Sequence, residues 1–117
     1  MSLETDLYTV LSGLCPRVYP DAAPASTATP YITWQQIGGD AFTYVEGSLP
    51  DRRNARIQIN VWDKSRIAST TLMLQVEQAI CAATQFQGRV DSAHLATFDD
   101  DTDLRGCMQD FSIWALR

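Results

Sequence analysis

The stretch Ala55-Arg56-Ile57-Gln58-Ile59-Asn60-Val61-Trp62-Asp63, residues 55–63, decides the fold of this chain. Ile57, Ile59 and Val61 occupy alternate positions, and the side chains between them point the other way. Such a period of two is typical of a strand with one face on the core. The stretch therefore predicts a β-strand in a sheet that is covered on one side.

After Asp63 the apolar period changes from that of a strand to that of a helix. Asp63 and Ser65 are both available as the N-cap residue, and the two alternatives stay open. The apolar residues that share one narrow arc of this helix are Ala68, Leu72, Val76, Ala79, Ile80 and Ala83. We expect this helix to pack on the sheet.

The opposite side of the same helix carries a second apolar line, where a simple surface helix would be polar. Its members, Ile67, Leu74 and Cys81, are seven residues apart. Two coverings are open, the amino-terminal helix of this chain or another subunit. In the second case these three residues form part of a subunit interface.

The amino-terminal part of the chain predicts one helix, a connector and a strand. The helix has Ser2 as N-cap, stops near Gly13, and carries the apolar stripe Leu3, Leu7, Val10, Leu11 and Leu14. Residues 20–30 hold three prolines and no large apolar side chain, which favours an extended connector. Residues 31–37 are rich in β-branched and aromatic residues and predict a strand. Residues 38–54 are expected to form a long, partly mobile loop, and a short strand inside it stays open.

The carboxyl-terminal part of the chain predicts a β-hairpin. Its strands are expected at 89–98 and 106–116, joined by the acidic turn 99–103. The second strand carries apolar residues on both faces, which favours a place inside the sheet. The expected fold is α+β in a single domain, 1–117, with the order α-β-β-α-β-β. A mixed, mainly antiparallel sheet of four to five strands packs against two helices.

The composition excludes several classes of function. Nine basic and 14 acidic residues give a net charge of −5, which disfavours nucleic acid as the main partner. The amino terminus is acidic and no apolar run is long enough for a membrane span, so neither a signal peptide nor a membrane partner is expected. Three widely spaced cysteines and a single histidine predict free thiols and no zinc site.

Nothing in the sequence indicates catalysis, a cofactor or a bound metal. Asp99, Asp101 and Asp103 match the start of a calcium loop, but Leu104 stands where such a loop needs glycine. A solvated hairpin tip is the better interpretation of these aspartates. His94 has no nucleophile turn near it, so an enzyme is not expected.

The charges are concentrated in two segments. Five of the nine basic residues fall between positions 52 and 66, and four aspartates fall between positions 99 and 103. Opposite patches suit a head-to-tail contact that closes into a ring, with Asp99, Asp101 and Asp103 of one subunit facing Arg52, Arg53 and Arg56 of the next. Two solvated loops, or a contact within one chain, are equally open.

The whole chain resembles a family of small phage tail completion proteins, also described as tail-to-head joining or tail terminator proteins of tailed phages and prophages. The segments Pro30-Tyr31-Ile32-Thr33-Trp34 and Arg56-Ile57-Gln58-Ile59-Asn60-Val61-Trp62, followed by a polar break and a long helix, carry the resemblance. The resemblance implies an α+β fold and a structural role, without cofactor, metal or catalytic residue.

The resemblance also implies partners and a location. In that family a ring, commonly of six subunits, caps the tail tube and offers a docking surface to the head connector, and a member can stay monomeric in dilute solution until the tube is present. The implied location is the bacterial host cytoplasm during assembly and then the virion tail. The alternative function is a small-ligand or protein-binding module of the bacterial cytoplasm, without catalysis.

Overall fold

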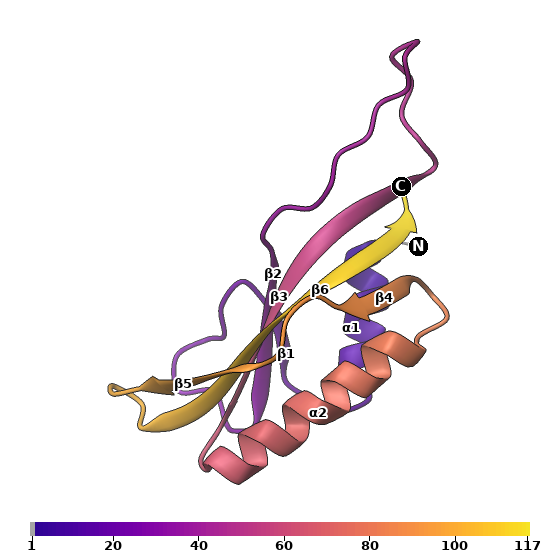
Figure 1. Ribbon diagram of the computed structural model, residues 1–117. Helices are drawn as coiled ribbons and strands as arrows, with labels where there is room; N and C mark the ends of the chain where they lie inside the picture. The colour runs from indigo at the N-terminus through magenta and orange to yellow at the C-terminus, as the bar shows by residue number, and fades with distance from the viewer. Residues whose placement is uncertain (1) are drawn as a thin grey trace.

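The computed structural model describes residues 2–117, which form a long twisted sheet with two helices on one of its faces (Figure 1). The molecule is elongated, with principal extents of 52 × 25 × 24 Å. In chain order the elements are α1 (Leu3–Ser12), β1 (Val18–Pro20), β2 (Tyr31–Gln36), β3 (Arg52–Asp63), α2 (Arg66–Ala82), β4 (Gln87–Val90), β5 (Leu95–Asp99) and β6 (Leu104–Leu116).

The sheet is mixed and mostly antiparallel, which confirms the α+β class. Its strand order is β1-β2-β3-β6-β4, and β5 also pairs with β6. Only the pairing of β1 with β2 is parallel. As expected, β6 lies inside the sheet, with β3 along one edge and β4 and β5 in succession along the other.

The sheet has six strands, so the expected four to five is too few, and the element order is α-β-β-β-α-β-β-β. The additional strand β1 precedes the connector and pairs with β2 through three residues. The single strand expected at 89–98 is instead β4 and β5, because the chain leaves the ladder at residues 91–94. There Ser92 bonds to β6 through its hydroxyl and its carbonyl oxygen instead of continuing the ladder.

The core lies between the helices and one face of the two long strands. Ile57, Ile59 and Val61 are fully buried, as their alternation predicts, and they pair with Phe111, Gln109 and Cys107 of β6. Ile32 of β2 extends this face, and the two helices cover it. The opposite face of the sheet is mixed, with Arg56 beside Asp110 at its centre and Trp62, Met108 and Trp114 toward its ends.

Local capping explains where each helix begins. The Ser2 hydroxyl oxygen accepts a hydrogen bond of 3.1 Å from the Thr5 backbone N–H, and the Ser65 hydroxyl oxygen accepts one of 3.1 Å from the Ala68 N–H. Ser65 is therefore the N-cap of α2, and Asp63 ends β3 instead. Each helix starts where a side chain satisfies an otherwise unpaired backbone donor.

Residues 38–51 form a long arm that projects beyond the end of the sheet (Figure 1). Its tip is a turn in which the Tyr44 N–H donates to the Ser48 carbonyl oxygen and the Gly47 N–H to that of Tyr44. At its other end Gly39 has φ +143°, and a Cβ there would lie 2.5 Å from the Asn54 carbonyl oxygen. The expected loop 38–54 is three residues too long, because β3 already begins at Arg52.

Candidate functional site

The arm carries a group of apolar side chains that the rest of the molecule does not cover. Phe42, Tyr44 and Leu49 are half-exposed, and Val45 is completely exposed. A folded chain that places several large apolar residues on one protruding segment has a surface suited to another molecule. The arm is therefore a candidate binding surface.

One aromatic contact ties the arm to the sheet. The ring of Phe42 lies 5.5 Å from that of Trp114 on β6, measured between centroids. Around this pair is an open groove of about 390 Å³, lined by Phe42, Tyr44, Pro50, Arg52, Gln87 and Trp114. Sequence reasoning did not find this groove, because its residues come from three separate segments. Two signals for it were present in the sequence: the apolar residues Phe42, Tyr44 and Val45 within the expected loop, and the position of Trp114 in the last strand.

The second apolar line of α2 is solvent-exposed. Ile67 is 81% exposed and Leu74 is 50% exposed, and Cys81 is exposed as well. The amino-terminal helix buries its stripe in the core that it shares with the sheet and with the other face of α2. The alternative in which α1 covers this line is therefore wrong. Covering by another subunit stays a prediction.

The basic residues between positions 52 and 66 do not form one patch. Arg52, Arg53 and Arg56 lie at the start of β3, next to the arm, whereas Lys64 and Arg66 follow the other end of that strand. The interpretation of this segment as a single positive patch is wrong, because residues 57–63 of the extended strand, roughly 25 Å of chain, separate Arg56 from Lys64.

Two of the three arginines beside the arm form ion pairs within the chain. Arg53 Nη2 lies 3.5 Å from Glu4 Oε1. Arg56 lies 3.0 Å from Asp110 and 3.2 Å from Asp91, and the Asp110 hydrogen bond, followed by the charge of Asp91, raises the pKa of Arg56. Arg52 is exposed and forms no ion pair within residues 2–117. Of these three arginines, it is therefore the one whose charge is free to attract a partner.

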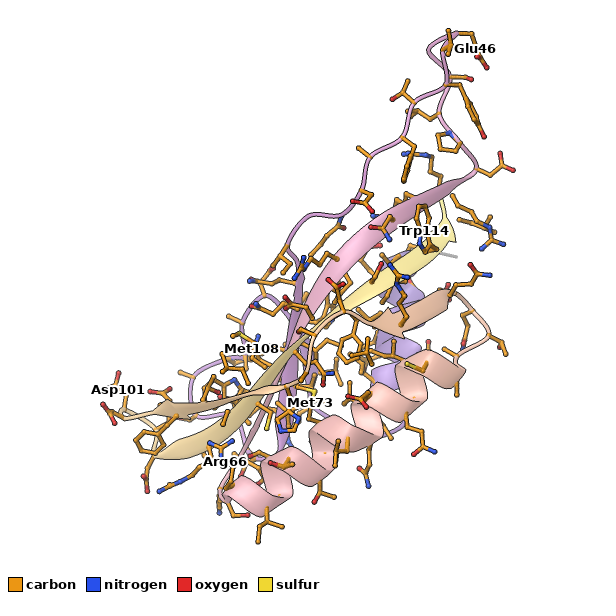
Figure 2. All side chains as sticks on the ribbon, viewed as in Figure 1. Glu46, Arg66, Met73, Asp101, Met108 and Trp114 are labelled. Carbon is orange, nitrogen blue, oxygen red and sulfur yellow. The ribbon has the colours of Figure 1, made fainter. Side chains whose placement is uncertain are left out.

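The acidic turn lies at the end of the molecule opposite the arm. In the β3–β6 ladder Arg52 pairs with Leu116, and Asp63 pairs with Arg105, next to the turn. Figure 2 shows Glu46 at the tip of the arm and Asp101 at the other extreme. Asp99 accepts a hydrogen bond from the Asp101 N–H, and Asp103 pairs with Arg105. Arg52, Arg53 and Arg56 therefore do not meet the acidic turn within one chain, whereas Lys64 lines the same cavity as Thr102 of that turn.

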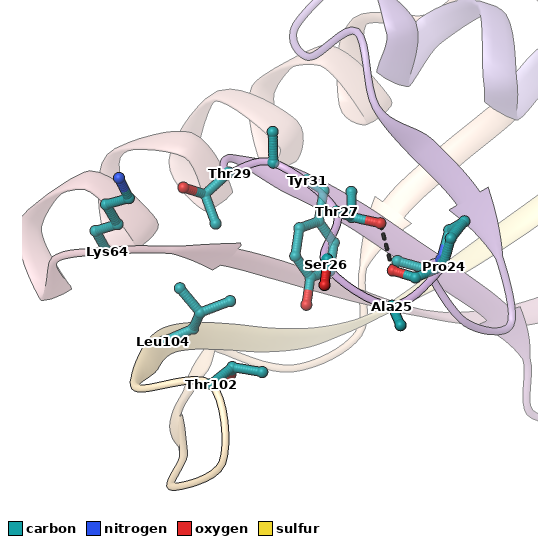
Figure 3. A pocket seen from close by; sticks show the side chains of 11 residues that line it. Pro24, Ala25, Ser26, Thr27, Thr29, Tyr31, Lys64, Thr102 and Leu104 are labelled. Atoms are coloured by element: carbon teal, nitrogen blue, oxygen red, sulfur yellow. Dashed lines mark hydrogen bonds between the residues drawn. The ribbon is translucent and has the colours of Figure 1, made fainter.

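A cavity of about 630 Å³ lies beside the acidic turn (Figure 3). Residues 23–29 of the connector line it, together with Tyr31, Lys64, Thr102 and Leu104. Partial burial raises the pKa of Tyr31, and the nearby charge of Asp99 adds to this effect. The lining is mostly hydroxyl and methyl groups, and its titratable side chains are Tyr31 and Lys64.

Residues 2–117 hold neither a metal-binding cluster nor a membrane-spanning helix. No group of three or more histidine, cysteine or acidic side chains in that range is placed to hold a metal ion. No helix in that range has both the length and the apolar character needed to cross a membrane. Cys15 and Cys107 are buried free thiols, and Cys81 is an exposed one.

Comparisons with known proteins found a similar fold in a solved structure and a matching family model. A solved structure entitled "Virion of native gene transfer agent (GTA) particle" contains a chain that matches with a TM-score of 0.69 at 13% sequence identity. The match covers 99% of this chain and 96% of that one, which shows a shared fold. No curated protein matches the sequence. The family model described as "Tail completion protein gp17" matches residues 4–116. Since that match spans nearly all of its length, the chain belongs to the tail completion protein gp17 family.

Proposed function

We propose that this chain is a non-enzymatic structural subunit of a tailed phage or prophage that caps the tail tube and helps to join the tail to the head. The observation that carries the proposal is the family match over residues 4–116. The likeness of the fold to a chain in a gene transfer agent virion supports it. The host cytoplasm is the place of assembly, and the virion tail is the final location.

The subunit acts as part of a ring, with six copies as the expected number. A ring needs a heterologous contact, in which two different surfaces of each copy meet. The elongated molecule has two such surfaces at opposite ends, the arm with Arg52 beside it and the acidic turn with Asp99, Asp101 and Asp103. Asp101 lies in the exposed turn, so it is available to a neighbouring copy.

The other residues of the proposed interface do not all contribute in the same way. Ile67, Leu74 and Cys81 present an uncovered apolar line and belong to the proposed interface. Arg53 and Arg56 already have acidic partners in their own chain, so they shape the arm end more than they attract a partner. The outer partners of the ring are the tail tube protein and the head connector proteins.

Electron microscopy of tail tubes tests the proposal. Tubes assembled from the tube protein encoded beside this chain's gene are mixed with the purified chain, and bovine serum albumin replaces it in the control. We expect one ring of density at a single end of each tube. Bare tube ends at saturating concentrations of the chain would overturn the proposal.

The groove beside Trp114 favours a second candidate function, the binding of a small apolar ligand. Phe42, Tyr44 and Trp114 supply aromatic walls, and Arg52 supplies one charge at the rim. A screen of common metabolites by thermal shift tests this alternative, because a ligand that binds only the folded state raises the melting temperature. A Trp114→Ala variant must lose any shift that arises from this groove.

A further inference from the structure

The outer face of α2 carries no free charge, which is unusual for a helix surface in contact with water. The helix has only two charged residues, Arg66 and Glu77. Arg66 donates to the carbonyl oxygens of Thr97 and Gly106, and Glu77 accepts from the Gln109 side chain at 2.8 Å. Both charged side chains are thus hydrogen-bonded within the chain. The exposed residues of this face are Ile67, Thr71, Leu74, Gln75, Gln78, Cys81 and Ala82.

A face of this kind is suited to a partner. The buried centres of protein interfaces are depleted of charged residues, and here the exposed centre is both uncharged and partly apolar. Ile67 is 81% exposed, so burying its side chain against a partner would be favourable in free energy. The inference below rests on the proposed ring and concerns what lies on this face.

The chain's own arm does not reach this face. β3 runs from Arg52, where the arm ends, to Asp63, just before α2. At roughly 3.3 Å per residue this strand is about 36 Å long. The stretch from the arm tip at Glu46 back to Arg52 spans at most about 20 Å. The arm also projects away from the start of α2 (Figure 1), so an arm that contacts Ile67 comes from another copy.

The arm and the outer face of α2 match in chemistry. Residues 41–45 of the arm carry no charge, and they include the exposed side chains of Phe42, Tyr44 and Val45. This uncharged run lies between Asp40 at its base and Glu46 at the tip of the arm. The pKa of Glu46 is lowered by its own backbone N–H and by the Ser48 hydroxyl, so the carboxylate at the tip is ionised at neutral pH.

The matching positive charge lies at the start of α2. Lys64 is exposed, and its ammonium group forms no ion pair within residues 2–117. It lies three residues before Ile67, at the end of the uncharged face. An uncharged segment that ends in a carboxylate thus has its counterpart in an uncharged helix face that ends in an ammonium group.

We propose that the arm of each copy lies along α2 of the next copy, with Val45 against Ile67 and Leu74, and with Glu46 beside Lys64. The contact joins opposite ends of identical molecules. Each copy therefore makes two contacts, one through its own arm and one through its α2, and this repeating contact is what a closed ring needs. The arm then forms the buried centre of the subunit contact, whereas the acidic turn and Arg52 contribute only charge.

A charge exchange tests the polar half of this contact. Glu46→Lys and Lys64→Glu are each expected to lower the amount of ring on tail tubes several-fold, because each sets like charges side by side. The double variant is expected to regain most of the loss. Glu46→Lys combined with Arg89→Glu is the matched control, because Arg89 is exposed on β4, and this control should not regain it.

A cross-link tests the apolar half. In a Cys81→Ser background, chains with Val45→Cys are mixed with mass-tagged chains with Ile67→Cys and oxidised with diamide. The remaining Cys15 and Cys107 are buried and stay unreacted. We expect a disulfide-linked dimer of one tagged and one untagged chain, at several times the yield obtained with tagged Thr9→Cys chains. Thr9 is an exposed position on α1 and serves as the control.

The two experiments separate this inference from the proposed function. If wild-type rings form but the exchange fails to rescue and the cross-link yield equals the control, the arm contact is wrong and the capping role stands. If the cross-link forms but tubes stay bare, the arm contact stands and the capping role is wrong. If neither rings nor the specific cross-link appear, both are overturned.

Discussion

The guanidinium Nη2 of Arg66 donates a 2.7 Å hydrogen bond to the carbonyl oxygen of Thr97 on β5. Its Nη1 donates to the carbonyl oxygen of Gly106 on β6. The first residue of α2 therefore holds both strands of the acidic hairpin. The exposed Ile67 follows directly in the chain, so the acidic turn and the start of the uncovered helix face belong to one rigid unit.

Replacing Arg66 tests this clamp. Arg66→Met keeps an unbranched apolar stem but removes the guanidinium and leaves two carbonyl oxygens without their donor, and we expect a loss of about 1–3 kcal/mol in the free energy of unfolding. Arg52→Met is the control, because Arg52 is exposed, and it should change stability by less than about 0.5 kcal/mol. Urea denaturation followed by tryptophan fluorescence measures both. Equal effects of the two substitutions would contradict the clamp.

Gly106 is required by close packing between neighbouring strands. A Cβ at this position would lie 2.5 Å from Thr97 Oγ1 and 2.8 Å from the ring of Trp62. We therefore expect Gly106→Ala to destabilise the fold by about 1–3 kcal/mol. Gly13→Ala is the control, since its backbone has φ −67° and its nearest contact would be 3.4 Å. Thermal unfolding of both variants checks the difference, and a neutral Gly106→Ala would refute it.

The pKa of Tyr31, which follows the connector, depends partly on the charge of Asp99 in the acidic turn. Burial, and secondly the charge of Asp99, raise this pKa above its ordinary value of 10.0. A raised pKa in the folded state means that Tyr31 contributes stability below pH 10 that is lost as the pH rises through the folded pKa. Asp99→Asn should lower the pKa only in part, because burial, the larger cause, persists.

A pH titration of ¹³Cζ-labelled tyrosine followed by NMR measures this effect. Asp101→Asn is the matched control, because the charge of Asp101 does not contribute to the shift of Tyr31. The titration midpoint of Tyr31 should move downward in the Asp99 variant and stay in place in the control. Identical midpoints in the two variants would contradict the contact between the turn and Tyr31.

Regular periodicity is what made most of the fold predictable. The alternation around Ile59 and the helical arc through Val76 reflect burial on one face, and such burial produces a periodic apolar pattern in the sequence. The exposed line through Leu74 was visible for the same reason. Sequence could not tell what covers that line, because the position of α1 depends on contacts between distant segments.

Features that rest on tertiary pairing were missed. Val18–Pro20 is too short to show a period, and its extended form depends on hydrogen bonds to β2. The break at residues 91–94 depends on Ser92, which bonds to residues of β6 far along the chain. The groove beside Trp114 likewise joins three separate segments. The opposed charged ends became visible only once the register of β3 and β6 was known.

The neighbouring positions 73 and 74 separate folding from assembly. Leu74 is 50% exposed, so Leu74→Asp should leave the monomer folded and prevent ring formation. Met73 is fully buried in the core, so Met73→Asp should unfold the chain, at a cost of several kcal/mol. Circular dichroism and ring counts on tail tubes measure the two outcomes. If Leu74→Asp also unfolds the monomer, Leu74 belongs to the core and not to the interface.

The acidic turn offers the last test, because its charge faces solvent at the end of the molecule opposite the arm. In the head-to-tail ring, Asp101 and Asp103 attract the basic residues beside the neighbour's arm, so changing both to Lys should weaken self-association and binding to tail tubes. Asp103 has φ +56°, a conformation that asparagine tolerates better than lysine does. Asp101→Lys combined with Asp103→Asn therefore reverses one charge and removes the other at little cost to the backbone. Light scattering in 50 mM and 500 mM salt measures the effect, which should shrink at high salt because screening weakens an exposed charge contact. An unchanged oligomer mass and unchanged tube binding in both variants would remove the acidic turn from the interface.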